Sequence, residues 1–221
     1  MKIAILLTGF LRTYLHTYDF LKNNLINSHS CDIYPITWEE QEDKRLVNKN
    51  SFDIYSHNII NFKIINNAEY YKNKKYFIPL NRSNDVFITN ERAKVHGHYW
   101  ANRLFDQWYL VQQGFKLIKN PHSYDCIIRL RYDLQLRHID IKKGNNLIIP
   151  KDIGGWNFTD HMAYGNVINM EKYCHLNSQI FEMYENHNID ITHAVDMPRF
   201  YMQKNNIPYE IDNNIKYEIF K

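Results

Sequence analysis

The stretch from residue 124 to residue 133 constrains the fold most, because charged side chains alternate with apolar ones inside it. Arg129, Arg131 and Asp133 are spaced two apart, and strand residues two apart point to the same face. We therefore expect these three side chains to share one side of a central strand. Two cations and an anion are costly to bury unpaired. The pattern predicts that they hold a ligand, and an ion pair of an arginine with Asp125 or Asp133 is the alternative.

The first residues predict another central strand, followed by a turn. Residues 3–7 form a continuous apolar run, as in a parallel strand that is buried on both faces. Thr8, Gly9 and Arg12 follow, and Gly9 permits a tight turn into a helix expected over residues 12–25. Ligands of α/β sheets collect at the carboxyl ends of the strands. These three residues are therefore candidate nucleotide ligands, with an ordinary strand–turn–helix connection as the alternative. No phosphate-loop or dinucleotide fingerprint is present.

The rest of the chain alternates between strand-like and helix-like segments. This alternation predicts an α/β fold with a mainly parallel central sheet flanked by helices. No linker divides the sequence, so residues 1–221 are expected to form a single domain. Further strands are expected over residues 31–38, 58–65, 147–150, 207–211 and 215–220, and further helices over residues 69–75, 99–120, 169–186 and 196–205.

Two segments are expected to have structural roles only. Leu104, Trp108 and Val111 fall at helical spacing within residues 99–120, so we expect that helix to pack its apolar stripe against the core. Residues 39–44 are mostly charged, and we interpret them as a solvated loop.

Charge and cysteine content exclude several classes of function. The formal net charge of the 221 residues is only +3, which argues against nucleic acid as the main partner. The three cysteines are odd in number and widely spaced, so neither a disulfide framework nor a zinc site is indicated. No apolar run reaches the roughly 18 residues that a transmembrane segment needs. We therefore expect a cytoplasmic protein without a transmembrane segment.

Blocks spread over most of the chain resemble a group of small glycosyltransferases. Residues 7–13, 32–38 and 124–133 carry the likeness, and residues 159–166 and 196–207 continue it in the same order. The group occurs in bacterial surface-polysaccharide loci and in large DNA viruses. The single-domain size also resembles the first domain of the chlorella-virus enzyme that glycosylates the major capsid protein. For a viral protein, the expected location becomes the host cytoplasm.

The resemblance implies a GT-A fold, with a Rossmann-like nucleotide half (about residues 1–133) and an acceptor half (about residues 134–221). The donor would be a nucleotide-sugar, most often UDP-linked in this group, and the acceptor a glycan or glycoprotein. Such folds usually bind Mn²⁺ or Mg²⁺ through an Asp-x-Asp motif after a central strand. Here Arg131-Tyr132-Asp133 takes that place, which makes Asp133 the predicted metal ligand. Either a metal binds through Asp133, diphosphate and water, or an arginine supplies the charge instead.

The resemblance also assigns roles at the donor. Asp133 with a divalent ion, helped by Arg129 or Arg131, would neutralise the diphosphate as the glycosidic bond breaks. The three residues after the first strand would bind the nucleotide. Trp38 would lie beside the base or ribose, or it would pack in the core.

Candidate residues for activating the acceptor come from the second half of the chain. Asp160 is the first candidate base and Asp196 the second, and each could instead be a helix N-cap. His161 and His193 lie close to these acids and could assist, while Trp156 could stack on an acceptor sugar. Whether transfer inverts or retains the anomeric centre does not follow from these residues. In a retaining enzyme Asp160 would only orient the acceptor.

Two other functions fit the same residues. A nucleotidyltransferase or another nucleotide- or sugar-phosphate enzyme would also place an acid after a strand and use basic phosphate ligands. A non-catalytic carbohydrate- or nucleotide-binding module would fit the aromatic content of 15%. Activity on a nucleoside triphosphate would identify the nucleotidyltransferase, and binding without turnover would identify the non-catalytic module.

Overall fold

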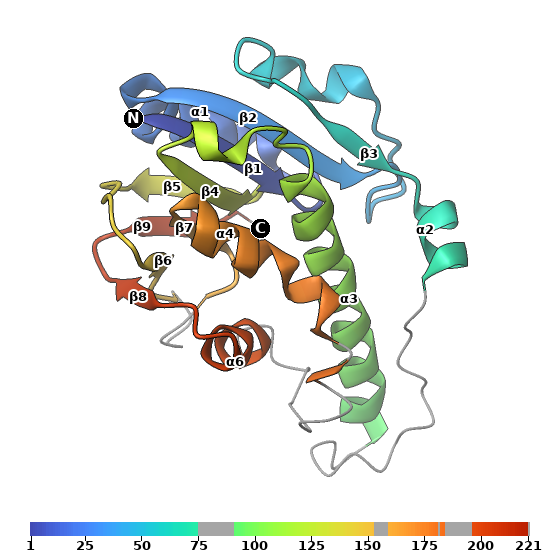
Figure 1. Ribbon diagram of the computed structural model, residues 1–221. Coiled ribbons are helices and arrows are strands. Elements are labelled where there is room, and N and C mark those ends of the chain that lie inside the picture. Colours follow the sequence, from blue (N-terminus) through green and yellow to red (C-terminus); the bar gives the residue numbers. More distant parts are fainter. Residues whose placement is uncertain (75–90, 153–158, 181, 184–195, 221) are drawn as a thin grey trace.

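The computed structural model describes residues 1–74, 91–152, 159–180, 182–183 and 196–220 of the chain, with only the backbone described for residues 91–102 and 196 (Figure 1). Within this part, seven strands form one mixed, mostly parallel sheet flanked by helices. Their spatial order is β3 (Lys63–Ile65), β2 (Ser30–Trp38), β1 (Lys2–Thr8), β4 (Cys126–Arg131), β7 (Met162–Gly165), β6 (Leu147–Pro150) and β8 (Tyr209–Asp212). The predicted α/β class and mainly parallel sheet are confirmed.

Only β7 runs against its neighbours in this sheet. β3, β2, β1 and β4 are parallel to one another, β7 is antiparallel to both β4 and β6, and β6 is parallel to β8. A separate two-stranded antiparallel sheet joins β5 (Leu134–His138) to β9 (Lys216–Ile219). The carboxyl ends of β1, β2 and β4 consequently meet at one edge of the main sheet.

Strand alternation divides the core into two clusters on opposite faces of the sheet. In β1, Ala4 and Leu6 belong to one cluster, whereas Ile3 and Ile5 belong to the other, and all four are fully buried. The continuous apolar run of β1 therefore reflects burial on both faces, as predicted. The first cluster includes side chains from three helices: α3 (Glu91–Phe115), α4 (Val167–Cys174) and α6 (Asp196–Lys204). The second includes α1 (Tyr14–Asn24) and the β5–β9 sheet.

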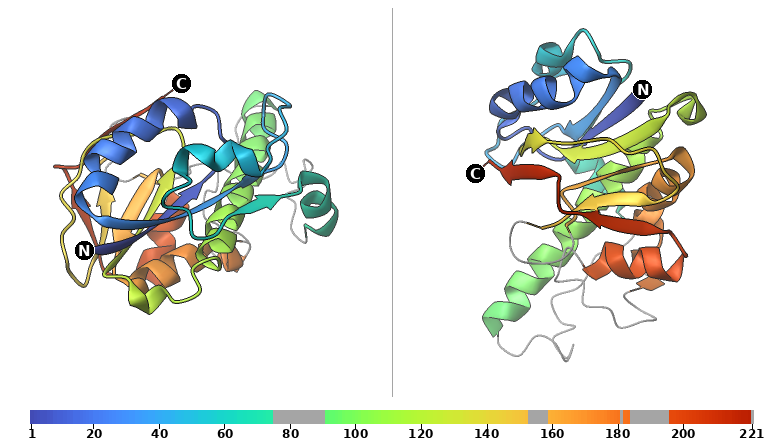
Figure 2. Two further views of the ribbon diagram at one scale, coloured as in Figure 1. Left: turned by 90° about the horizontal axis from the view of Figure 1, so that it is seen from above. Right: turned by 90° about the vertical axis from the view of Figure 1, so that its left-hand side faces the viewer.

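Several predicted boundaries are wrong by a few residues or more. α3 begins at Glu91 and ends at Phe115 rather than spanning residues 99–120, and its amino-terminal half extends beyond the sheet (Figure 2). The strand expected over residues 58–65 is only Lys63–Ile65, preceded by the 3₁₀ helix η2 (Lys49–Tyr55). α4 begins before the predicted start of residue 169 and ends at Cys174, where the 3₁₀ helix η4 (His175–Ser178) follows. α2 spans Asn67–Asn73, close to the prediction. No helix in the described residues is long and apolar enough to cross a bilayer.

Gly114 allows α3 to lie close to the sheet. A Cβ atom at this position would come within 2.4 Å of Leu6 Cδ1 and 2.8 Å of Ile36 Cγ2. We expect Gly114→Ala to lower the free energy of unfolding by about 1–3 kcal/mol through overpacking. This clash should outweigh the gain in helix propensity, which is only about 1 kcal/mol. Denaturant unfolding would measure it, with Gly144→Ala as the control, because a Cβ there meets nothing within 4 Å. A Gly114→Ala variant as stable as the native chain would contradict the close packing.

Candidate functional site

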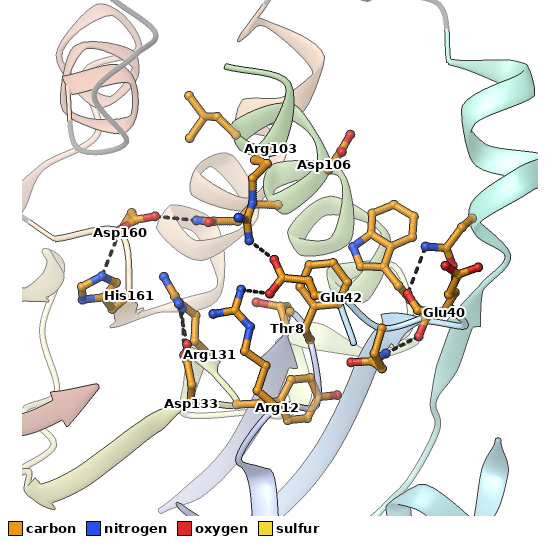
Figure 3. A pocket seen from close by; sticks show the side chains of 18 of the residues that line it. Thr8, Arg12, Glu40, Glu42, Arg103, Asp106, Arg131, Asp133, Asp160 and His161 are labelled. Carbon is orange, nitrogen blue, oxygen red and sulfur yellow. Dashed lines mark hydrogen bonds and ion pairs between the residues drawn. The ribbon is translucent and has the colours of Figure 1, made fainter. Parts of the chain in front are cut away.

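A pocket of about 810 Å³ opens at the carboxyl ends of β1, β2 and β4 (Figure 3). Its lining includes every predicted site residue of these three strand ends, and Asp160, namely Thr8, Gly9, Arg12, Trp38, Arg129, Arg131, Asp133 and Asp160. A volume of this size suits a small-molecule ligand. Asp196 begins α6, and its side chain lies outside the described part of the structure, as do His193 and Trp156.

The turn after β1 is held by neighbouring strands. Gly9 has a φ of +118°, a conformation that side-chain-bearing residues rarely adopt. Its carbonyl accepts a hydrogen bond of 2.7 Å from Thr37 Oγ1 at the end of β2. Thr8 is buried, and its hydroxyl accepts from Arg129 Nε at 3.2 Å. The predicted turn is therefore a fixed part of the pocket wall.

Arg129 is a buried cation whose hydrogen-bond partners are neutral. Its side chain is fully buried, and Nη1 donates to the backbone carbonyl of Asp160. The guanidinium lies 5.7 Å from the centroid of the Trp108 ring. Burial lowers the pKa of Arg129 from its ordinary value. Nη2 is also buried and has no hydrogen-bond partner among the described residues, an arrangement that costs free energy unless a ligand or water satisfies the donor.

Arg131 makes a two-bond ion pair with Asp133. Nε donates to Oδ1 at 2.9 Å and Nη2 donates to Oδ2 at 2.5 Å. Burial acts to lower the pKa of Arg131, but the charge of Asp133 and its hydrogen bonds outweigh burial and raise it. The three charged residues at the end of β4 do share one pocket, as predicted. For Arg131 the ion-pair alternative holds with Asp133, while Asp125 pairs with Lys143 at 3.0 Å.

The residues around Asp133 do not fit a metal ion held by protein ligands. Both carboxylate oxygens of Asp133 already accept hydrogen bonds from Arg131. Among the described residues, no group of three or more His, Cys, Asp or Glu side chains gathers in a metal-binding arrangement. The Mn²⁺ or Mg²⁺ site at Asp133 stays a prediction.

Asp160 is a buried carboxylate two residues before β7. Gln107 Nε2 donates to its Oδ2 at 2.6 Å, and His161 Nε2 lies 3.5 Å from its Oδ1. The helix N-cap alternative is wrong, because strand β7 follows Asp160. Burial acts to raise the pKa of Asp160, but His161, Arg131, Arg129 and the Gln107 hydrogen bond together lower it. The carboxylate is therefore ionised at neutral pH.

His161 completes a short chain of polar contacts. Its Nδ1 lies 3.4 Å from Tyr217 Oη, and its other ring nitrogen faces Asp160. Burial lowers the pKa of His161, and Arg131 and Arg129 lower it further, while Asp160 opposes them. Since the ordinary value is 6.5, the imidazole is mainly neutral at neutral pH. A neutral imidazole beside an ionised carboxylate is able to accept a proton.

Trp38 lies both in the core and in the wall of the pocket. Its side chain is buried. Its ring is nearly parallel to those of Tyr71 and Tyr109, with interplanar angles of 11° and 14°. Tyr71 lines the pocket too and is 52% exposed. The aromatic wall thus consists of an exposed ring backed by a buried one.

Sequence reasoning missed three contributors to the pocket, one of which is α2 with Tyr71. Residues 39–44, interpreted as a solvated loop, place Glu40, Gln41 and Glu42 in the lining. Helix α3, expected to serve only the core, contributes Arg103 and Gln107, one turn apart. The helical spacing that identified the apolar stripe also places these two polar residues side by side next to it. The sequence therefore contained a signal that could have identified them as pocket residues.

The polar face of α3 also fixes α2 in place. Asp106 accepts hydrogen bonds from the hydroxyls of Tyr70 and Tyr71 and from Lys74 Nζ, at 2.8, 3.0 and 2.7 Å. These three donors come from α2 and the residue after it. Asp106 therefore holds the exposed aromatic ring of Tyr71 at the rim of the pocket.

No protein-family model matches the sequence, and no curated protein matches it. The geometry of the pocket is therefore the basis on which a function can be inferred for the chain.

Proposed function

We propose that the chain is a glycosyltransferase that moves a sugar from a nucleotide-sugar, most simply a UDP-sugar, to a glycan or glycoprotein acceptor. One observation carries the proposal. Four arginines, Arg12, Arg103, Arg129 and Arg131, line a single pocket together with the buried carboxylate of Asp160. Glycosyl transfer needs positive charge for the leaving diphosphate, and an inverting enzyme also needs a base for the acceptor hydroxyl.

The arginines suit the diphosphate. Guanidinium groups bind phosphate oxygens in pairs of parallel hydrogen bonds. Arg129 keeps a buried donor without a described partner, and Arg131 is oriented by its pair with Asp133. Because Arg129 is shielded from water, its charge acts more strongly on a nearby phosphate than an exposed charge would. Tyr71, backed by Trp38, offers a ring face to the base.

Asp160 and His161 are placed for the acceptor. We assign His161 as the group that takes the proton of the acceptor hydroxyl and Asp160 as the carboxylate that stabilises the resulting imidazolium. The lowered pKa of Asp160 makes it a weak base by itself. If transfer retains the anomeric configuration, the leaving diphosphate takes the proton of the acceptor hydroxyl and the same pair only orients the acceptor. For the fold, we propose a GT-A arrangement. Its support is that four parallel strands (β3, β2, β1, β4) meet a second half of mixed direction (β7, β6, β8) at the pocket.

Calorimetric titration with UDP-, GDP- and dTDP-sugars tests the proposal. We expect one nucleotide series to bind, and hydrolysis or transfer from the same nucleotide-sugar to follow. Failure of every nucleotide-sugar to bind would contradict the glycosyltransferase function. Turnover of a nucleoside triphosphate instead would indicate a nucleotidyltransferase, and binding without any turnover would indicate a binding module.

The same titration, repeated after chelation of divalent ions, tests the role of Asp133. We expect the binding of UDP to persist, because Arg131 already occupies both oxygens of Asp133 and the other arginines supply positive charge. Loss of binding in chelator, restored by Mn²⁺, would show instead that Arg131 releases Asp133 to a metal ion.

A further inference from the structure

One carboxylate lies between two arginines in the pocket. Glu42 Oε2 pairs with Arg12 Nη2, and Glu42 Oε1 pairs with Arg103 Nη2 (Figure 3). The three residues come from the turn after β1, the loop after β2 and helix α3. All three side chains are partly exposed, between 29% and 41%. Ion pairs at this exposure contribute little to stability, so the arrangement calls for another explanation.

The Glu42 carboxylate presents one oxygen to each of the two arginines. A carboxylate and a phosphate group offer guanidinium groups the same pattern of acceptor oxygens. The site lies in the pocket that also contains Arg129 and Arg131. A diphosphate, with its two phosphate groups, could contact both pairs of arginines.

The backbone that carries Glu42 is firmly attached. Gln41 is buried, and its side-chain oxygen accepts from Leu11 N at 2.6 Å while its nitrogen donates to Trp38 O at 2.6 Å. Arg45 Nη2 donates to Leu11 O at 3.0 Å. Leu11 immediately precedes Arg12, so side chains of the loop hold the backbone next to this arginine through hydrogen bonds. Glu42 therefore leaves the arginines by rotation of its side chain, without opening of the loop.

We propose that Arg12 and Arg103 form a diphosphate clamp, and that Glu42 occupies it in the free protein. The ligand must displace the Glu42 carboxylate, which therefore acts as an internal competitor and weakens binding. The identification of the ligand as the diphosphate of a nucleotide-sugar rests on the proposed function. The clamp itself requires only a diphosphate.

Glu42→Gln tests the clamp directly. The amide keeps the shape of the side chain and removes the charge that competes for the arginines. We expect inorganic pyrophosphate and UDP to bind about tenfold more tightly to this variant, since the two exposed ion pairs of Glu42 no longer have to be broken. Calorimetry at fixed salt would measure both. Adding Arg103→Gln to Glu42→Gln should remove the gain, because the competitor acts through this arginine.

Asp43→Asn is the matched control. It lies in the same loop and removes the same charge, but its carboxylate pairs with Arg45 at 3.5 Å, and Asp43 is not among the described residues that line the pocket. We expect less than about a twofold change in pyrophosphate affinity, given screening of exposed charges. If Asp43→Asn gained as much pyrophosphate affinity as Glu42→Gln, the effect would come from the change in net charge alone, and the clamp would be overturned.

Unchanged or weaker binding by Glu42→Gln would also overturn the proposal, because Glu42 would then orient the arginines rather than compete for them. The two probes separate this inference from the proposed function. If pyrophosphate gains affinity in Glu42→Gln while no nucleotide-sugar binds, the clamp stands and the glycosyltransferase function fails. If UDP-sugars bind the native chain and Glu42→Gln changes nothing, the function stands and the clamp fails.

Discussion

Asp160→Asn is expected to lower kcat for sugar transfer by about 10²–10⁴-fold, the usual contribution of general acid–base catalysis. The amide has the shape of the carboxylate but cannot stabilise a protonated His161, whose ring nitrogen lies 3.5 Å from Oδ1. The hydrogen bond from Gln107 reaches Oδ2, and a side-chain amide whose oxygen occupies that position retains this bond. Donor binding should therefore change by only a few-fold, which calorimetry with UDP would check.

The pH profile supplies a second measurement that a purely structural role would not alter. In the native chain kcat/KM should fall only below pH 6.5, because burial and two arginines lower the pKa of His161 from 6.5 and keep the imidazole neutral. Asp160 opposes that shift. Its replacement should lower the pKa of His161 further and move the acid limb to lower pH. An Asp160→Asn variant with native kcat and an unchanged acid limb would exclude the pair from catalysis.

Arg129→Met is expected to weaken UDP binding by about 10- to 100-fold, the usual value for one charge-assisted hydrogen bond. The guanidinium is fully buried in the pocket wall, and its Nη2 has no described partner. Methionine fills most of the space beside Trp108 but supplies neither charge nor donors. The loss should appear in the dissociation constant for UDP measured by calorimetry.

Arg137→Met is the matched control for this substitution. Arg137 lies on β5, where it pairs with Glu218 at 2.9 Å and is 45% exposed, and it is not among the described pocket-lining residues. Its replacement should leave UDP binding unchanged. Arg129→Lys keeps the charge but not the planar fork, so it should give an intermediate loss and provides a milder test if Arg129→Met unfolds. Native affinity in both Arg129 variants would contradict a role at the diphosphate.

Local patterns predicted the strands at the centre of the fold. The apolar run of β1 and the alternation in β4 depend only on the two-residue period of a strand, and both gave the correct faces. The same period placed Arg129, Arg131 and Asp133 in one pocket. Boundaries were less accurate where packing decides them. Gly114, for example, lies against Leu6 near the end of α3, a contact that no local pattern reveals.

The roles of single polar residues were harder to predict than their positions. Asp160 was a candidate base or a helix cap, and only the pairing of β7 with β4 excludes the cap. Residues 39–44 have the composition of a solvated loop, but Gln41 is buried against Leu11 and Trp38 and holds Glu42 at the pocket. Composition indicates only the average exposure of a segment, whereas the hydrogen bonds of the single buried amide of Gln41 decide where this loop lies.

The sequence by itself determined the α/β class, the central strands and the residues that the strand ends deliver to one edge of the sheet. Those features follow from local periodicity and from the rule that parallel strands end together. Only the tertiary structure decided which charges meet. Arg131 turns to Asp133 two residues away, and Arg12 and Arg103 converge on Glu42 from elements far apart in the chain. Ion pairs depend on distances of a few ångströms between side chains, and such distances between separate elements are set by the packing of helices on the sheet.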